Sequence, residues 1–212
     1  MVNNVLVILA SFNGEKYIQD QIFSILSQKL VSVELYIFDD CSNDKTVDII
    51  NSFNDKRIHF FQNTISSGNA ANNFLYSLTY ILKSNIDNYD YISFSDQDDI
   101  WLEYKLFNSI NSIYTKNFDL YCSNLMLWDE DNNNKRILKK DFAQKKYDFL
   151  FEGASAGCTY VFTRKFAENL SLNFSKIDLK NWKYFSHDWY LYFFARLNNF
   201  KVFIDHNSYI LY

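Results

Sequence analysis

Short apolar runs alternate with segments of helical pattern through the first half of the chain. The runs predict strands, and they are Val5–Ala10, Val33–Phe38, Arg57–Gln62 and Tyr91–Ser95. The segments between and after them carry apolar residues at helical spacing, namely Ile18, Ile22, Ile25 and Leu26; Val47, Ile50 and Phe53; Phe74, Leu78, Ile81 and Leu82; and Leu102, Leu106, Ile110 and Ile113. Val5–Ala10 is apolar throughout, as expected of a strand buried on both faces of a parallel sheet. The alternation predicts right-handed βαβ units and an α/β fold with a mostly parallel sheet flanked by helices.

The pattern loses its regularity near Asn117. Beyond it we expect strands at Phe118–Leu127, Gly157–Phe162 and Lys201–Asp205, a hairpin tip at Asp129–Asn134, and a helix at Asp188–Leu197. The stretches Lys139–Tyr147 and Leu170–Lys183 have no clear pattern. Without a linker or a repeat, residues 1–212 read as one domain, whose second half covers the first and shapes a pocket.

Composition narrows the class of protein. With 48% hydrophobic and 22% charged residues, the chain predicts a packed globule, and its 19% aromatic residues must fill a core or line a groove. The net charge of -4 argues against a nucleic-acid partner, and an acidic protein that binds a diphosphate needs a cation to offset the charge. The three cysteines, Cys41, Cys122 and Cys158, lack C-x-x-C spacing, which favours reduced thiols in a cytosolic protein.

Neither a membrane span nor a signal peptide is indicated by the sequence. No apolar run approaches the length of a span, and the short run Val5–Ala10 has no basic region before it. Proline is absent and there are only four glycines, so the turns must depend on Asn, Asp and Ser. Asn13 and Ser42 are therefore expected to cap the first and second helices.

The most informative stretch is the end of the fourth strand, where Asp96, Asp98 and Asp99 crowd together. Neighbouring carboxylates resist ionisation, and a bound divalent cation would relieve their repulsion. Oxygen ligands favour Mg²⁺ or Mn²⁺. A calcium loop of EF-hand type is excluded because its sixth and twelfth positions would be Trp101 and Phe107. We expect one of Asp98 and Asp99 to cap the next helix, but a cap does not require three acids.

Two other loops end neighbouring predicted strands. Asp39 and Asp40 follow the second strand, and could either accept hydrogen bonds from a pyrimidine N3–H or ribose, or merely form a solvated turn. Ser11–Glu15 follows the first strand and could bind an anion or a base edge through backbone N–H groups, or serve only as a helix start. This segment lacks both glycine-rich phosphate-loop spacings, G-x-G-x-x-G and Walker-A.

His187, Asp188 and Trp189 open the last long helix. A partly buried carboxylate beside aromatic rings would have a raised pKa and could act as a general base toward a hydroxyl. The alternative is a capping Asp with a packed His. His59 and His206 lie outside any cluster and are expected to be structural.

In this order and spacing, the segments resemble family 2 glycosyltransferases, which are inverting, nucleotide-sugar-dependent enzymes of the GT-A fold. The matching segments are 7–14 (VILASFNG), 38–44 (FDDCSND) and 94–101 (FSDQDDIW), and the last is similar to a bacterial rhamnosyltransferase-like branch. Segments 156–159 (AGCT) and 187–189 (HDW) are similar to that branch too. The resemblance implies a nucleotide-binding half (1–116), an acceptor-binding half (117–212), and a Mg²⁺ or Mn²⁺ cofactor.

The resemblance also implies a role for each matching residue. Nucleotide binding would fall to Ala10, Ser11, Asn13, Glu15, Asp39, Asp40 and Asp96. Asp98 would ligate the metal that bridges the diphosphate, and Asp188 would deprotonate the acceptor hydroxyl. Supporting residues and residues of the sugar or acceptor cleft would be Asp99, Trp101, Gly157, Cys158 and His187.

The implied donor is dTDP-rhamnose or a UDP-sugar, and the implied acceptor a saccharide or lipid-linked oligosaccharide of bacterial surface polysaccharide synthesis. The enzyme would then be cytoplasmic, with a possible peripheral association at the inner membrane face. Relatives of this branch continue past Tyr212 with a His-containing segment, so the chain is expected to be truncated there. One alternative is a catalytically impaired nucleotide-sugar-binding module. A sugar-phosphate nucleotidylyltransferase ranks lower, because that family has a Gly-rich, Arg-bearing N-terminal loop, whereas Ser11–Lys16 has one Gly and no Arg.

Overall fold

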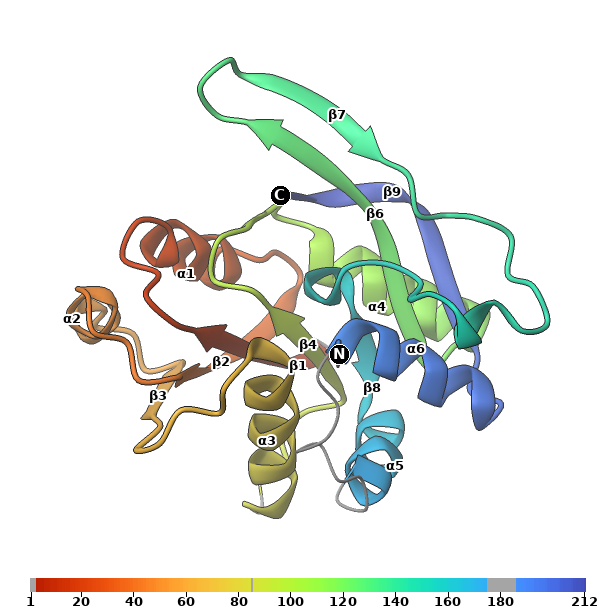
Figure 1. Ribbon diagram of the computed structural model, residues 1–212, viewed down its shortest axis with the longest axis horizontal. Helices are drawn as coiled ribbons and strands as arrows, with labels where there is room; N and C mark the ends of the chain where they lie inside the picture. Colours follow the sequence, from red (N-terminus) through yellow and green to blue (C-terminus); the bar gives the residue numbers. More distant parts are fainter. Residues whose placement is uncertain (1–2, 85, 175–185) are drawn as a thin grey trace.

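The computed structural model describes residues 3–84, 86–174 and 186–212. In these ranges one sheet contains the strands β1 (Asn3–Ser11), β2 (Val31–Asp39), β3 (Ile58–Gln62), β4 (Tyr91–Ser95), β5 (Ile100–Trp101), β6 (Leu120–Asp129), β7 (Asn134–Leu138), β8 (Val161–Thr163) and β9 (Val202–Leu211). The α-helices are α1 (Ile18–Leu26), α2 (Thr46–Ser52), α3 (Ala70–Lys83), α4 (Lys105–Lys116), α5 (Arg164–Phe174) and α6 (His187–Leu197), and two 3₁₀ turns are η1 (Asp148–Leu150) and η2 (Gly157–Thr159). The sheet order is β3-β2-β1-β4-β8-β6-β9-β5, with β7 paired to β6 (Figure 1).

The first half of the sheet is parallel, as the alternating pattern predicts. Strands β3, β2, β1 and β4 pair in parallel, with Ser11 opposite Asp39 and Leu9 opposite Ser95. The polar residues that follow these strands therefore meet along one edge. In open α/β sheets this carboxyl edge is where ligands bind.

The second half completes the sheet with strands of both directions. Strand β8 is antiparallel to β4 and β6, whereas β9 is parallel to β6 and antiparallel to β5. The hairpin tip expected at Asp129–Asn134 is confirmed by the β6–β7 pairing. The strand expected from Gly157 is wrong for its first part, since Gly157–Thr159 forms η2 and β8 begins at Val161. Strand β9 continues beyond the predicted end, Asp205, to Leu211.

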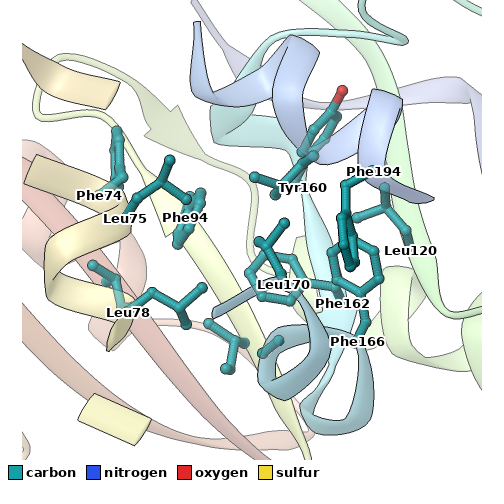
Figure 2. Close-up of a cluster of buried hydrophobic side chains, with 14 of the residues drawn as sticks. Phe74, Leu75, Leu78, Phe94, Leu120, Tyr160, Phe162, Phe166, Leu170 and Phe194 are labelled. Carbon is teal, nitrogen blue, oxygen red and sulfur yellow. The ribbon is translucent and has the colours of Figure 1, made fainter. Parts of the chain in front are cut away.

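Helices cover both faces of the sheet, and the side chains of β1 alternate between two apolar clusters. On one face Leu6 and Ile8 pack with α3, α5 and α6, and on the other Val5, Val7 and Leu9 pack with α1, α2 and α4. Figure 2 shows the first cluster, in which Phe74 of α3 and Phe166 of α5 lie on either side of Phe94 and Phe162. Phe94 meets Phe74 at 4.7 Å and Phe162 at 5.2 Å between ring centroids. The high aromatic content is thus used to fill this layer.

Three predicted caps are wrong. Helix α1 begins after Tyr17 and α2 after Lys45, so neither Asn13 nor Ser42 caps a helix. Strand β5 follows the acidic loop directly, and α4 begins only at Lys105, so neither Asp98 nor Asp99 is a cap. These polar side chains instead bind neighbouring loops or face a cavity, as described below.

One stretch without a clear pattern is partly helical. The end of α5 occupies residues 170–174, and the remainder of Leu170–Lys183 lies outside the described residues. The residues before it, from Arg164, were not predicted as helical, although Phe166, Ala167 and Leu170 form a buried stripe.

Candidate functional site

Two loops at the carboxyl edge are joined residue by residue. The backbone N–H groups of Asn13, Gly14 and Glu15 donate to the side chains of Ser42, Thr46 and Asp44, at 2.8, 2.7 and 3.1 Å. In return, Asn13 Oδ1 accepts from the backbone of Asn43 and Glu15 Oε2 from that of Lys45. Because these side chains are engaged with each other's loops, Asn13 and Glu15 hold the loops after β1 and β2 together.

Asp39 lies beneath these loops and is fully buried. Its Oδ1 accepts hydrogen bonds from the hydroxyls of Ser11, at 3.0 Å, and Ser42. Its Oδ2 accepts from the backbone N–H of Ser42 at 2.9 Å. Asp39 therefore positions the two loops from below.

Asp40, one residue further on, points to the other side and is held by a third loop. Its oxygens accept from Asn63 Nδ2 at 2.9 Å, from Ser66 Oγ at 2.9 Å, and from both the N–H and the hydroxyl of Ser67. Burial alone would raise the pKa of Asp40, but these hydrogen bonds outweigh it and hold the pKa below its usual value. Asp40 is therefore a permanent anion at neutral pH.

An open cavity of about 370 Å³ lies along this edge. Among the residues that the sequence singled out, Ala10, Ser11, Asp40, Asp96 and Asp98 line it together. The rest of its lining is Phe12, Ser66, Gly68, Asn69, Ala70, Asn73 and Gln97. In the described part of the chain, Asn13, Glu15 and Asp39 are not among the residues lining this cavity. The structure thus brings five of the eight predicted nucleotide and metal positions to one cavity, and the other three hold the loops behind it.

Gln97 links the acidic loop to the loop after β1. Its Oε1 accepts from the backbone N–H of Phe12 at 2.8 Å, and its Nε2 donates to the carbonyl of Phe12 at 3.0 Å. Gly14 leaves room for this side chain, because a Cβ there would lie 2.3 Å from Gln97 Oε1. The amide therefore acts as a short strand-like pairing between two loops that are far apart in sequence.

The three acids after β4 differ in environment. Asp98 is exposed and faces the cavity, Asp96 is half-buried, and Asp99 is buried. Burial, with the charges of Asp98 and Asp188, raises the pKa of Asp96 to about 7. Burial and the charge of Asp96 raise the pKa of Asp99 to about 8. Asp96 and Asp99 therefore hold their protons more tightly than free carboxyl groups do, and a bound cation could take the place of those protons.

A buried lysine lies behind the acidic loop. Lys105 Nζ donates to Ser93 Oγ at 3.0 Å and sits 3.4 Å from the ring centroid of Trp101. Burial lowers the pKa of Lys105 to about 7, although Cys158 and Asp99 favour its charged form. Trp101 is held in turn by its backbone N–H, which donates to Ser24 Oγ. These contacts support the wall of the site from the side away from the cavity.

The donor set suits a hard divalent cation. Ligand atoms of Asp96, Asp99 and Cys158 lie within 4.8 Å of one another, and no described nitrogen or oxygen donor bonds the two carboxylate oxygens of Asp99. Burial and the charge of Asp99 raise the pKa of Cys158 well above its usual range, so it remains a protonated thiol and a poor ligand. Exposed Asp98, with Asp96 beside it, is the better candidate for a metal that faces the cavity.

Asp188 is the second residue of α6 and lines another cavity, of about 400 Å³. Its Oδ1 accepts from the backbone N–H of Trp189 at 2.7 Å and from Ser186 Oγ, and its carbonyl accepts from the hydroxyl of Tyr160. Burial raises the pKa of Asp188, while the N–H of Trp189 and the charge of Lys140 oppose the rise. A raised pKa and an open cavity are what a general base toward a hydroxyl requires.

Gly157 of η2 lies against the ring of His187 at the start of α6. A Cβ on Gly157 would lie 2.0 Å from His187 Nε2, so only glycine fits here. The His187 ring packs on Phe74 at 4.5 Å, and its Nε2 has no hydrogen-bond partner among the described residues. Burial lowers the pKa of His187 to about 4, so the ring is neutral. Its packing role agrees with the simpler interpretation of this histidine.

Tyr212 connects the acidic loop to the cavity of Asp188. It lines the Asp188 cavity and also a cavity of about 390 Å³ bordered by Asp98 and Asp99. Its backbone is fixed by hydrogen bonds with Met126 and Trp128 of β6. Together with the charge of Asp188 acting on Asp96, this places the predicted base and the predicted metal ligand along one continuous edge.

The sequence analysis missed the residues that organise the acids. Gln97, Asn63, Ser67, Lys105 and Tyr212 were not predicted as site residues. Gln97 has a signal in the sequence, since it stands between Asp96 and Asp98. Ser67 has a weaker one, since it belongs to the polar loop Ser66–Asn69. The contacts of Lys105 and Tyr212 depend on the sheet order, for which the local pattern gives no signal.

Fold and site together define the class of protein. The profile of glycosyl transferase family 2 matches residues 6–171. The chain belongs to glycosyl transferase family 2, which confirms the resemblance found in the sequence and makes it a member of a family of transferase enzymes.

Two curated relatives illustrate the range of the family near this chain. The dTDP-rhamnosyl transferase RfbG of Shigella flexneri is 36% identical over 211 residues, which cover 96% of this chain and 70% of the relative. The UDP-Glc:alpha-D-GlcNAc-diphosphoundecaprenol beta-1,3-glucosyltransferase WfgD of Escherichia coli is 32% identical over 159 residues, which cover 74% of this chain and 58% of the relative. The matched region is thus only a part of each relative.

Solved structures confirm the GT-A fold. S. aureus TarS 1-349 in complex with UDP-GlcNAc has a TM-score of 0.73 at 18% identity, over 99% of this chain and 58% of that one. The mannosyltransferase PcManGT from Pyrobaculum calidifontis, in complex with GDP-Man and Mn2+, has a TM-score of 0.62 at 13% identity, over 100% of this chain and 57% of that one.

Among the helices of the described ranges, none combines the length and the hydrophobicity that a bilayer crossing needs.

Proposed function

We propose that this chain transfers a sugar from a nucleoside-diphosphate sugar to a hydroxyl of a saccharide acceptor, with inversion and with the help of a divalent cation. The observation that carries the proposal is the shared cavity of Asp40, Asp96 and Asp98, which lies at the carboxyl edge of the parallel strands. Asp188, whose own pKa is raised, lines a second cavity, and its charge helps to raise the pKa of Asp96. Donor and acceptor would thus meet between the two cavities.

On the donor side, the residues would bind the nucleotide in order along the edge. Ala10 and Ser11 at the end of β1, and Asp40 of the loop after β2, would bind the nucleoside. Asp96 would lie toward the ribose, and Asp98 would hold Mg²⁺ or Mn²⁺. The cation, when bound, offsets the charge of the departing diphosphate. An anionic rim would otherwise repel an anionic donor.

On the acceptor side, Asp188 would remove one proton from the attacking hydroxyl. The hydrogen bonds to its Oδ1 from Trp189 and Ser186 hold the carboxylate in one orientation. The hydroxyl oxygen would bond to the anomeric carbon as the bond to the diphosphate breaks, and the proton would remain on Asp188. One displacement of this kind inverts the configuration.

The preferred donor is proposed from the relatives. RfbG is named a dTDP-rhamnosyl transferase and WfgD a transferase that uses UDP-Glc. The higher identity and the wider coverage favour dTDP-rhamnose over a UDP-sugar for this chain. The name of WfgD also specifies a diphosphoundecaprenol acceptor, which makes a lipid-linked saccharide the proposed acceptor class.

Metal-dependent donor binding tests the proposal directly. Thermal unfolding measured with Mn²⁺ and each of dTDP-rhamnose, UDP-glucose and GDP-mannose should show the largest rise in Tm with dTDP-rhamnose. A ligand present at about 100 times its Kd stabilises the fold by about 2.7 kcal/mol. Removing Mn²⁺ with EDTA should abolish most of that rise.

The matched variants are Asp98→Asn and Asp48→Asn. Asp48 is an exposed acid of α2, so its loss changes the net charge equally without touching the site. Asp98→Asn should lose the Mn²⁺-dependent rise, and Asp48→Asn should keep it. If the chain bound none of the nucleotide sugars with Mn²⁺, or bound them equally well after Asp98→Asn, the proposal would be rejected.

A further inference from the structure

Residues 135–151, which we call the basic–aromatic segment, have a composition unlike that of the rest of the chain. They contain six of the 21 Lys and Arg residues but only two of the 25 acids, in a protein of net charge -4. One of those acids, Asp148, is neutralised by an ion pair with Arg196 at 2.9 Å. Cationic charge is therefore concentrated in one stretch of an otherwise acidic molecule.

The same segment exposes large apolar side chains. Exposed fractions are 82% for Phe151, 65% for Phe142, 59% for Ile137, 54% for Tyr147 and 46% for Leu150. These five large exposed hydrophobic residues fall within fifteen consecutive positions beside the basic residues, which favours an interaction surface over an ordinary solvent face with singly scattered apolar groups.

Rings and ammonium groups are paired across this surface. Lys139 Nζ lies 5.9 Å from the ring centroid of Phe142, and Lys146 Nζ lies 5.0 Å from that of Tyr147. Lys135, in the part of the segment that forms β7, has its Nζ 5.2 Å from the ring centroid of Trp128 of β6. Each pair presents an apolar ring and a cation side by side, a combination that suits the boundary between lipid headgroups and acyl chains.

The segment adjoins the proposed acceptor side. Lys140 and Phe151 line the cavity of Asp188, and Lys140, Phe142 and Lys145 line a neighbouring cavity of about 450 Å³. Figure 1 shows that the part of the segment after β7 leaves the sheet and runs along the margin of the molecule toward α6. A surface that docked here would therefore lie beside the mouth of the acceptor cavity.

We infer that the basic–aromatic segment docks the protein on a bilayer surface that contains anionic lipids. Anionic headgroups would bind the lysines, and Phe142, Tyr147 and Phe151 would insert at the headgroup boundary. The exposed apolar residues favour a lipid surface over an acidic polysaccharide, which would match the charges and leave the apolar groups in water. Docking in this way would present the Asp188 cavity to a lipid-linked acceptor, and this purpose rests on the proposed function.

Vesicle co-sedimentation tests the docking surface without any donor or turnover. The unmodified chain should bind phosphatidylcholine vesicles that contain phosphatidylglycerol, and not vesicles of phosphatidylcholine alone. Binding should weaken as salt is raised, because screening shortens the reach of the headgroup charge. The double variant Lys139→Glu/Lys146→Glu should lower the partition coefficient at least tenfold, and Phe142→Ser/Tyr147→Ser should also lower it.

The matched control is Lys56→Glu/Lys83→Glu, which makes the same change of charge at two exposed lysines outside the segment. This control should bind the anionic vesicles within about twofold of the unmodified chain, because lysines away from the membrane add little attraction. Equal loss in the control, unchanged binding in the Lys139/Lys146 variant, or no binding of the unmodified chain would overturn the inference. Binding to soluble polygalacturonate but not to vesicles would overturn it too, and would assign the surface to a glycan.

Donor binding of the same variants, measured in solution without vesicles, separates this inference from the proposed function. If the docking surface is assigned correctly, the Lys139/Lys146 variant should keep its Mn²⁺-dependent thermal shift with nucleotide sugar. A chain that bound anionic vesicles but no nucleotide sugar would instead refute the proposed function and leave the docking surface standing.

Discussion

A single amide side chain holds two loops of the donor cavity in register. Both polar atoms of Gln97 bond to the backbone of Phe12, and Gly14 leaves the space that this requires. Because the loop after β1 and the acidic loop face the donor from either side, their spacing should decide how well a nucleotide fits between them. Gln97 is a positioning residue in this scheme.

Replacing Gln97 by Ala should weaken donor binding more than it slows the transfer step. Loss of two hydrogen bonds should cost about 1–3 kcal/mol of stability, and a loosened cavity should raise KM for the donor with a smaller change in kcat. Gln97→Glu keeps the acceptor for the Phe12 N–H and loses the donor to its carbonyl, so its KM should be intermediate. Steady-state kinetics with varied donor will measure this order, and an unchanged KM in Gln97→Ala would contradict it.

Asp188 should be needed for turnover and not for donor binding. Asp188→Asn keeps the shape of the side chain but cannot take a proton, so kcat should fall by roughly 10²–10⁴. The Kd for the donor with Mn²⁺, measured calorimetrically, should change little. A variant that kept near-normal turnover would remove Asp188 from the role of base, and a variant that lost donor binding would move it to the donor side.

The contact between η2 and α6 packs the start of the helix that carries Asp188. Gly157 of η2 touches the ring of His187 at the first position of α6, and that ring packs on Phe74 of α3. Three elements that are distant in sequence therefore depend on the absence of one methyl group.

Gly157→Ala should destabilise the fold by about 1–3 kcal/mol, the range found for overpacked cores. Combining it with His187→Ala should give less destabilisation than the two single changes predict together, because the second change removes the group that the first one meets. Denaturant unfolding of the four proteins of this cycle will measure the coupling. Additive effects would show that the ring of His187 is not the obstacle.

At the level of elements, prediction from sequence succeeded where the pattern was local. The run that became β1 is apolar on both faces, those that became β2 and β4 are rich in apolar residues, and the stripes of α1, α3 and α4 repeat at helical spacing. It failed at η2 and at most of α5, and at the far half of β9, where His206 and Asn207 interrupt the alternation near irregular pairing with β6. Strand β9 is set by its neighbours on both sides, and such pairing is invisible in a local pattern.

The same contrast holds for the site. Acids at the ends of parallel strands could be predicted to converge, because the carboxyl ends of such strands share one edge. Which acid faces the cavity could not be predicted. Adjacent residues turn to opposite sides, so Asp39 is buried under the loops while Asp40 lines the cavity. The supporting contacts of Gln97 and Lys105 arise only when strands and helices are assembled.

At the scale of the whole molecule, the acidic edge should lower the stability of the metal-free protein as pH rises. Asp96 has a pKa of about 7 in the folded protein and an ordinary value of 3.8. Between these values the folded state holds a proton that the unfolded state has released, so stability is present at low pH and is lost as pH rises. A bound cation should reverse the loss, because it replaces the proton.

Asp96→Asn removes this dependence and isolates it from other titrating groups. The difference in unfolding free energy between the variant and the unmodified chain, without metal, should grow by about 1–3 kcal/mol from pH 4 to pH 7. Mn²⁺ should stabilise the unmodified chain more at pH 7 than at pH 5. Denaturant titrations across this range measure both, and a difference that is flat with pH would show that Asp96 ionises normally.

The pairing of β9 has a consequence for the order of assembly during synthesis. Among the strands of the described ranges, β5, which leads directly out of the acidic loop, pairs with β9 alone, through Ile100 with Leu211 and Trp101 with Ile210. A nascent polypeptide can complete the four parallel strands early, but the pairing of β5 with β9 cannot form until residue 211 has left the ribosome. Such long-range closure is slow compared with local contacts. A half-made chain should therefore hold the nucleotide sugar proposed as its donor less firmly than the finished chain does.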